Sequence, residues 1–233
     1  VGCPICNSER NTSFPEYAIV FYLTKCGLEV IHSYREKGYE LDVYIPSKKI
    51  AIEYDGYFWH KNKTQEDLEK TIKSINDDNG IHGILLFRPL PKHMDEDRIK
   101  QLISMKKDID GMSNISLGNL FLCKTWEEIK KLNTFVPCTA MAVIRLLDFH
   151  QINPQGMETA VIGRSSTVGR PLAHLLSCRN ATVKTCHTFT KDLKVSLQNT
   201  QLICSAAGQA ELLTPQNTPA GSIVIDIATN LDK

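Results

Sequence analysis

The segment Val161-Ile162-Gly163-Arg164-Ser165-Ser166-Thr167-Val168-Gly169-Arg170-Pro171 decides the fold of the larger part of this 233-residue chain. The apolar run at 159–162 is typical of a buried strand, and the spacing of Leu172 and Leu175 predicts a helix after the segment. A strand, a glycine turn and a helix together present backbone N–H groups and a helix N-terminus to a phosphate. Arg164 lies inside this turn, where its guanidinium could hold a second phosphate.

Composition places the chain among ordinary globular proteins. Hydrophobic residues make up 42% of the 233 positions, which is enough for a packed core, and the length fits one large or two modest domains. The net charge of +1 gives no overall attraction to nucleic acid. The eight cysteines lack the spacing of a disulfide framework, and no signal peptide or membrane-spanning apolar run stands out. We therefore expect a cytoplasmic protein with no membrane partner.

Helical and strand-like patterns alternate from residue 135 onward. Predicted helices cover 140–149, 171–177 and 192–197, and predicted strands cover 159–162, 182–185, 202–205 and 223–227. Such alternation predicts an α/β fold, here a doubly wound, Rossmann-like lobe with a parallel sheet. A nucleotide is then expected across the carboxyl ends of the strands.

Further motifs surround the glycine turn in a fixed order. They are His82-Gly83-Ile84-Leu85-Leu86-Phe87-Arg88-Pro89-Leu90-Pro91, Lys107-Asp108-Ile109-Asp110-Gly111, Phe135-Val136-Pro137-Cys138-Thr139-Ala140, Asn180-Ala181-Thr182-Val183, Cys186-His187-Thr188-Phe189-Thr190 and Ile223-Val224-Ile225-Asp226. This order resembles the methylenetetrahydrofolate dehydrogenase/cyclohydrolase (FolD) family over residues 64–233. The resemblance divides that region into the end of a folate-binding lobe, 64–134, and an NAD(P)-binding lobe, 135–233.

The resemblance implies an oxidoreductase of one-carbon metabolism that uses NADP, acts on a tetrahydrofolate and forms a homodimer. By the same resemblance, Gly163, Arg164, Ser165 and Gly169 contact the cofactor phosphates. Thr188 lies beside a 2′-phosphate that Arg164 holds, which favours NADP over NAD. The glycines also fit a purely structural role in packing the strand tightly against the helix.

The folate site departs from the family pattern. Asp110 matches the family's pterin-binding aspartate. The family's glutamine is replaced by Phe87 and the following leucine by Arg88, and its catalytic lysine has no counterpart. Cyclohydrolase chemistry needs a proton shuttle at the one-carbon bridge, and a phenyl ring cannot replace an amide that hydrogen-bonds the substrate. We therefore expect the cyclohydrolase activity to be lost.

Residues 1–63 do not follow that family and predict a small α+β module. A helix with Glu16 in its first turn precedes two strands of alternating polarity, at 41–45 and 50–54, joined by a short turn. Acidic residues on the open face of such a hairpin are most often simply solvated.

The hairpin also brings the carboxylates of Asp42 and Glu53 together, and paired carboxylates with water suit Mg²⁺. With Glu16 alongside, this arrangement resembles the PD-(D/E)XK nucleases, in particular the very-short-patch-repair type. The resemblance implies a magnesium-dependent endonuclease, a hydrolase whose partner is DNA. Asp55 stands where that family often has lysine, which leaves His60 and Lys70 as candidates for the remaining catalytic role.

Cys3 and Cys6 form a C-x-x-C pair, the shape of half a zinc ribbon. A structural zinc site needs four ligands, and no second C-x-x-C occurs in this sequence. We expect either half of a zinc site whose other half precedes Val1 or simply two thiols.

Residues 64–91 fit both resemblances, since each implies a helix and then a strand here, with the strand-like run at 80–88. We place the junction near 61–66, where a polar run is either a boundary or a helix start. A natural fusion, a fragmentary gene and an artificial join all fit this pattern. Three functional hypotheses follow. The chain is a nuclease-like module joined to an NADP-binding lobe, or a working NADP-dependent methylenetetrahydrofolate dehydrogenase, or two incomplete domains with no function of their own.

Overall fold

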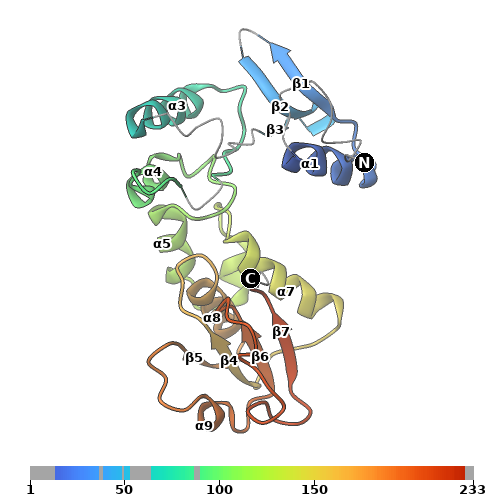
Figure 1. Cartoon of the computed structure of the whole chain (residues 1–233), viewed down its shortest axis with the longest axis vertical. Coiled ribbons are helices and arrows are strands. Elements are labelled where there is room, and N and C mark those ends of the chain that lie inside the picture. The colour runs from blue at the N-terminus through green and yellow to red at the C-terminus, as the bar shows by residue number, and fades with distance from the viewer. Residues whose placement is uncertain (1–13, 37–38, 49, 53–63, 87–89, 229–233) are drawn as a thin grey trace, which may run out of the picture. The chain divides into compact units, whose positions relative to one another are not determined.

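The computed structural model describes residues 14–36, 39–48, 50–52, 64–86 and 90–228 (Figure 1). The chain divides into two compact units, Val1–Ile109 and Asp110–Lys233. The junction expected near residues 61–66 falls inside the first unit. None of the helices in the described residues is long and apolar enough to cross a membrane.

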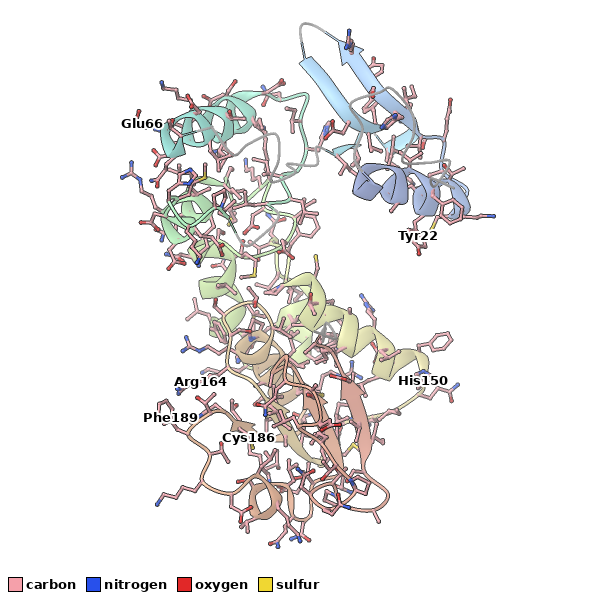
Figure 2. All side chains as sticks on the ribbon, viewed as in Figure 1. Tyr22, Glu66, His150, Arg164, Cys186 and Phe189 are labelled. Atoms are coloured by element: carbon pink, nitrogen blue, oxygen red, sulfur yellow. The ribbon has the colours of Figure 1, made fainter. Side chains whose placement is uncertain are left out.

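The first unit begins with a helix and a three-stranded antiparallel sheet in the order β1-β2-β3. The elements are α1 (Phe14–Lys25), β1 (Ile31–Glu36), β2 (Tyr39–Ile45), the short 3-10 helix η1 (Pro46–Lys48) and β3 (Ile50–Ile52). The predicted helix and hairpin are confirmed, and β1 is an additional strand. Val43 and Ile45 are buried, as their alternation predicted, whereas Tyr22 on α1 is exposed (Figure 2).

Two helices, α3 (Gln65–Asp77) and α4 (Glu96–Leu102), follow in the first unit. Thr64 and Asp67 form a capping box at the start of α3, so the polar run near residue 64 is a helix start. Ile72 of α3 packs with Ile99 of α4 in a small apolar cluster.

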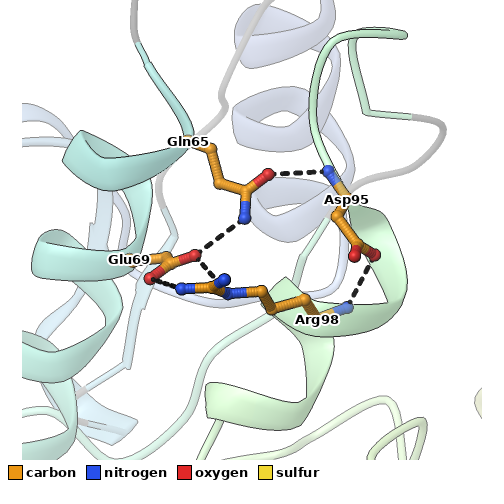
Figure 3. Close-up of polar contacts among 4 residues, drawn as sticks. All are labelled: Gln65, Glu69, Asp95 and Arg98. Atoms are coloured by element: carbon orange, nitrogen blue, oxygen red, sulfur yellow. Dashed lines mark hydrogen bonds and ion pairs between the residues drawn. The ribbon is translucent and has the colours of Figure 1, made fainter.

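A polar network links α3 to α4 (Figure 3). Arg98 pairs with the buried Glu69 through its Nε, 2.8 Å from Oε1, and donates from Nη2 to Oε2 at 3.0 Å. The Gln65 amide donates to Glu69 Oε1 at 2.8 Å, and the Gln65 carbonyl oxygen accepts from the Asp95 backbone N–H at 2.9 Å. The Asp95 carboxylate in turn caps α4. The bidentate geometry holds the two helices in a defined register.

We expect Glu69→Gln to lower the Tm of the chain at neutral pH and to make its stability less sensitive to acid. The hydrogen bonds from Gln65 and then from Arg98 lower the pKa of Glu69 in the folded protein. A lowered pKa gives stability that is present above the usual glutamate pKa of about 4.3 and is lost as the pH falls toward the folded value.

Thermal melts followed by circular dichroism from neutral to acidic pH would measure this effect. Glu127→Gln is the matched control, because the Glu127–Lys130 pair on α6 (Trp126–Lys130) is mostly exposed and is expected to contribute little. Equal Tm differences for Glu69→Gln at all pH values would contradict the prediction.

Both resemblances predicted a strand within 80–88, but the described part of this segment forms a single parallel bridge, Ile84 to Asp108. The Ile84 N–H donates to the Lys107 carbonyl at 2.6 Å, and the pairing does not continue along the described backbone. The Lys107 ammonium donates to the carbonyls of Ile75 and Asp78. It thereby stabilises the C-terminal end of α3, where a positive charge is favoured.

The second unit contains a four-stranded parallel sheet in the order β5-β4-β6-β7 (Figure 1). The strands are β4 (Glu158–Ile162), β5 (Thr182–Cys186), β6 (Leu202–Ser205) and β7 (Ile223–Asp226). All four lie where the sequence predicted them. The interior position of β4 explains its apolar run, because Thr159 to Ile162 are buried.

Helices cover both faces of this sheet. They are α5 (Asn114–Leu122), α6 (Trp126–Lys130), α7 (Cys138–Phe149), α8 (Gly169–Cys178) and α9 (Leu193–Leu197). Val161 and Leu202 share one cluster with residues of α7 and α8, whereas Ile162 and Ile203 share another with Leu197 of α9. The predicted doubly wound α/β architecture is therefore confirmed for this unit.

Candidate functional site

The turn after β4 brings three strand ends together. The Gly163 N–H donates to the Cys186 carbonyl at the end of β5 at 2.8 Å, and the Ala206 N–H donates to the Ile162 carbonyl at 2.8 Å. Gly163 has φ +116°, and a Cβ at this position would lie 2.8 Å from the Ala206 carbonyl oxygen. Only glycine fits this conformation and this close approach.

The second glycine of the turn is required for a different reason. A Cβ on Gly169 would lie 2.2 Å from the Gly163 carbonyl oxygen and 2.9 Å from the Arg164 nitrogen. The first turn of α8 therefore packs directly on the end of β4. Five residues separate Gly163 from Gly169, and a loop of this length lets the two glycines come into contact. This contact supports the structural role that we considered for the glycines, namely close packing of the strand against the helix.

Ser165 organises the start of α8. Its Oγ accepts hydrogen bonds from the N–H groups of Val168 at 3.2 Å and Gly169 at 3.3 Å and from the Thr167 hydroxyl at 3.1 Å. Its carbonyl accepts from the Arg170 N–H at 3.0 Å. The sequence predicted bare amides here, but the serine hydroxyl already caps two of them.

The loop after β5 reaches the same edge of the sheet. Its backbone closes on itself, since the His187 N–H donates to Thr190 Oγ1 at 2.8 Å and the Thr190 N–H donates to the His187 carbonyl at 2.7 Å. The Arg164 guanidinium lies over the Phe189 ring, 5.8 Å from its centroid. Arg164 therefore lies beside the loop that carries Thr188. The side chains of Arg164 and Thr188 are both exposed. No role was predicted for Phe189 from the sequence, although the motif at 186–190 identified its loop as part of the cofactor site.

One of the residues expected at the folate site, Asp110, begins the second unit. Asp110 is half-buried and precedes Gly111, which has φ +64°. A Cβ on Gly111 would lie 2.5 Å from the Phe135 carbonyl oxygen, so the backbone after Asp110 touches the segment that leads into α7. Phe87 and Arg88, which replace the family's glutamine and leucine, lie outside the described residues.

The residues proposed for a nuclease are only partly described. Glu16 lies on α1, Asp42 is half-buried on β2 and Lys70 is exposed on α3. Glu53, His60, Cys3 and Cys6 lie outside the described residues. Among the described residues, no group of three or more histidine, cysteine, aspartate or glutamate side chains is placed to hold a metal ion.

Two family models match the sequence. The tetrahydrofolate dehydrogenase/cyclohydrolase catalytic domain matches residues 37–110, and the NAD(P)-binding domain of the same proteins matches residues 137–233. The bifunctional protein FolD of Clostridium botulinum is 35% identical over 196 residues, which are 84% of this chain and 67% of that protein. The chain belongs to the tetrahydrofolate dehydrogenase/cyclohydrolase family.

Other members of the family are similarly related. FolD of Elusimicrobium minutum is 44% identical over 170 residues, 73% of this chain, and the chain spans only 59% of its length. A solved Trypanosoma brucei methylenetetrahydrofolate dehydrogenase-cyclohydrolase, complexed with NADP cofactor and an inhibitor, aligns with a TM-score of 0.65 and 33% identity. The alignment covers 72% of this chain and 56% of that one.

The family match corrects the interpretation of the N-terminal region. The catalytic domain model begins at residue 37, so it includes part of the segment that we had assigned to a nuclease-like module. These comparisons give no support to a PD-(D/E)XK nuclease, to a fusion, or to the magnesium, zinc and DNA that a nuclease would require. Hairpins of alternating polarity with acidic residues on one face occur in many folds, so this pattern alone does not indicate a nuclease.

The buried cysteines of the family's NAD(P)-binding domain are expected to resist alkylation. Burial raises the pKa of Cys178 to about 11 and that of Cys204 to about 12. Because the thiolate is the nucleophile, we expect iodoacetamide at neutral pH to modify the exposed Cys26 and Cys138 before the buried cysteines of the described residues. Peptide mass spectrometry would measure the order, with denatured protein as the control. Equal rates at Cys204 and Cys26 in the folded protein would contradict it.

Proposed function

We propose that this chain binds NADP at the β4–α8 turn and acts as an NADP-dependent methylenetetrahydrofolate dehydrogenase. The observation that carries this proposal is the meeting of the Arg164 guanidinium with the Thr188 loop at the ends of two neighbouring strands. A cation beside the loop that follows the second strand of a Rossmann-like unit favours a 2′-phosphate. The family membership and the NADP complex of the Trypanosoma brucei relative support it.

The pyrophosphate would lie against the glycine turn. Gly163 and Gly169 leave this surface without side chains, and α8 directs the positive end of its dipole toward the turn. The Ser165 hydroxyl and the N–H groups that it now caps would share hydrogen bonds with the phosphate oxygens. Arg164 would bind the 2′-phosphate through two parallel N–H bonds, with the Thr188 hydroxyl beside it.

The folate would bind near the start of α7, where Asp110 would accept hydrogen bonds from the pterin. NADP⁺ supplies the hydride acceptor when it is bound. One hydride leaves the methylene bridge of methylenetetrahydrofolate and reduces NADP⁺ to NADPH, and the folate becomes the methenyl cation, so no proton is transferred. The contribution of the chain is mainly to position the two reactants.

The cyclohydrolase step is proposed to be absent. Hydrolysis of the methenyl cation adds water and requires a group that moves a proton at the one-carbon bridge. Phe87 stands at the position of the family's glutamine, and its phenyl ring can neither donate nor accept the necessary hydrogen bond.

Two spectrophotometric assays test the proposal. With methylenetetrahydrofolate and NADP, the absorbance of NADPH is expected to rise, whereas the absorbance of added methenyltetrahydrofolate is expected to decay no faster than without protein. A steady NADPH signal from folded protein would reject the dehydrogenase. Accelerated decay of the methenyl compound would reject the proposed loss of the cyclohydrolase, and Phe87→Gln would show whether this position controls it.

A further inference from the structure

Phe189 is an exposed aromatic residue whose ring contacts the guanidinium of Arg164. Its side chain is 79% exposed, in a loop between β5 and α9. The loop is closed locally, and the Phe189 N–H itself donates to His187 Nδ1 at 3.2 Å. Figure 2 shows Phe189 and Arg164 on the same side of the second unit, near the end of β5 that Cys186 marks. A large apolar side chain left in solvent invites a functional explanation.

The partner of the ring is the cation expected to recognise the cofactor. The Arg164 guanidinium carbon lies 5.8 Å from the centroid of the Phe189 ring, within the range of a cation–π contact. In the described part of the chain no carboxylate forms an ion pair with Arg164. The aromatic face therefore restrains a long, exposed side chain without neutralising its charge.

This combination matters because an arginine has several rotatable bonds. Ordering an exposed arginine on binding costs conformational entropy, which lowers affinity. A ring that already holds the guanidinium reduces that cost, whereas a carboxylate partner would compete with the phosphate for the same N–H groups. The planar guanidinium keeps its edge N–H groups available while its face rests on the ring.

We propose that Phe189 is a positioning residue for cofactor selection, which holds Arg164 beside Thr188 so that its guanidinium is placed before the 2′-phosphate arrives. This inference rests on the proposed function. Replacing Phe189 should therefore change the affinity for NADP and leave the affinity for NAD nearly unchanged, because NAD carries no 2′-phosphate.

Isothermal titration of the full chain with NADP and with NAD tests this role. Phe189→Leu is expected to weaken NADP binding by about two- to fivefold, the size of an exposed cation–π contact, and to leave NAD binding unchanged. Phe189→Tyr and Phe189→Trp are expected to retain NADP affinity, since either ring can hold the guanidinium. Phe149→Leu is the matched control, because Phe149 is 80% exposed on α7.

A double-mutant cycle separates this role from a general effect on the fold. In an Arg164→Ala background, Phe189→Leu is expected to have no further effect on NADP affinity. Unchanged NADP affinity in Phe189→Leu, or an equal loss for NADP and NAD, would overturn the inference; an equal loss would indicate that the ring stacks on the adenine. Wild-type protein that binds neither cofactor would reject the proposed function itself, and the inference with it.

Discussion

Gly169→Ala is expected to weaken NADP binding strongly and to destabilise the second unit. The added methyl group would lie 2.2 Å from the Gly163 carbonyl oxygen and 2.6 Å from its carbon, and both are backbone atoms. Neither can move without separating α8 from β4, so the turn must open. Overpacking of this kind costs about 1–3 kcal/mol, which lowers Tm by roughly 3–15 °C.

The affinity for NADP is expected to fall at least about tenfold in this variant, because a phosphate site that is displaced by about an ångström loses its hydrogen-bond geometry. Calorimetry and thermal melts would measure both effects. Gly118→Ala on α5 is the control, since a Cβ there meets nothing within 4 Å. In an exposed helical position that change is expected to stabilise by about 0.5–1 kcal/mol. Gly169→Ala with wild-type Tm and affinity would show that the close approach is not required.

Arg164→Ala is expected to lower NADP affinity by about 1.5–3 kcal/mol, roughly a 10- to 150-fold loss, and to change NAD affinity little. The reason is the loss of charged hydrogen bonds to the 2′-phosphate, which NAD lacks. The Tm without cofactor is expected to stay close to that of the wild type, since Arg164 is exposed.

Arg145→Ala, at an exposed position on α7, controls for the general loss of one positive charge. Raising the salt concentration is expected to narrow the preference of the wild type for NADP, because exposed charge interactions are screened. Equal losses of NADP and NAD affinity in Arg164→Ala would assign the arginine to the pyrophosphate and refute its role in cofactor selection.

The α/β lobe could be predicted from the sequence because its signals are local and redundant. The buried run 159–162 marks an interior strand, and the helices and strands after it alternate with clear periodicity. Contacts between distant segments could not be predicted this way. The Ser165 cap depends on the detailed path of one turn, and the contact of Phe189 with Arg164 depends on two strands being neighbours.

The N-terminal region shows the limit of reading short motifs. Asp42 lies on a predicted hairpin that the structure confirms, yet this local success did not identify the family. Alternating polarity specifies a strand and one buried face, and it says little about the chemistry of the other face. The strand expected within 80–88 is not formed in the described residues 80–86 for a related reason. Pairing requires a neighbour along the whole strand, and within 80–86 the structure pairs only Ile84.

The order of strands in the parallel sheet predicts that the two loops of the proposed nucleotide site differ in rigidity. The glycine turn extends from β4, which is hydrogen-bonded to a strand on each side. The Phe189 loop extends from β5, which lies at the border of the sheet among the described strands. A border strand opens more readily than an inner one. In the proposed site the pyrophosphate would contact the more rigid glycine turn. The 2′-phosphate would lie between Arg164 on that turn and Thr188 on the more adaptable loop, so the selection of NADP would depend on both.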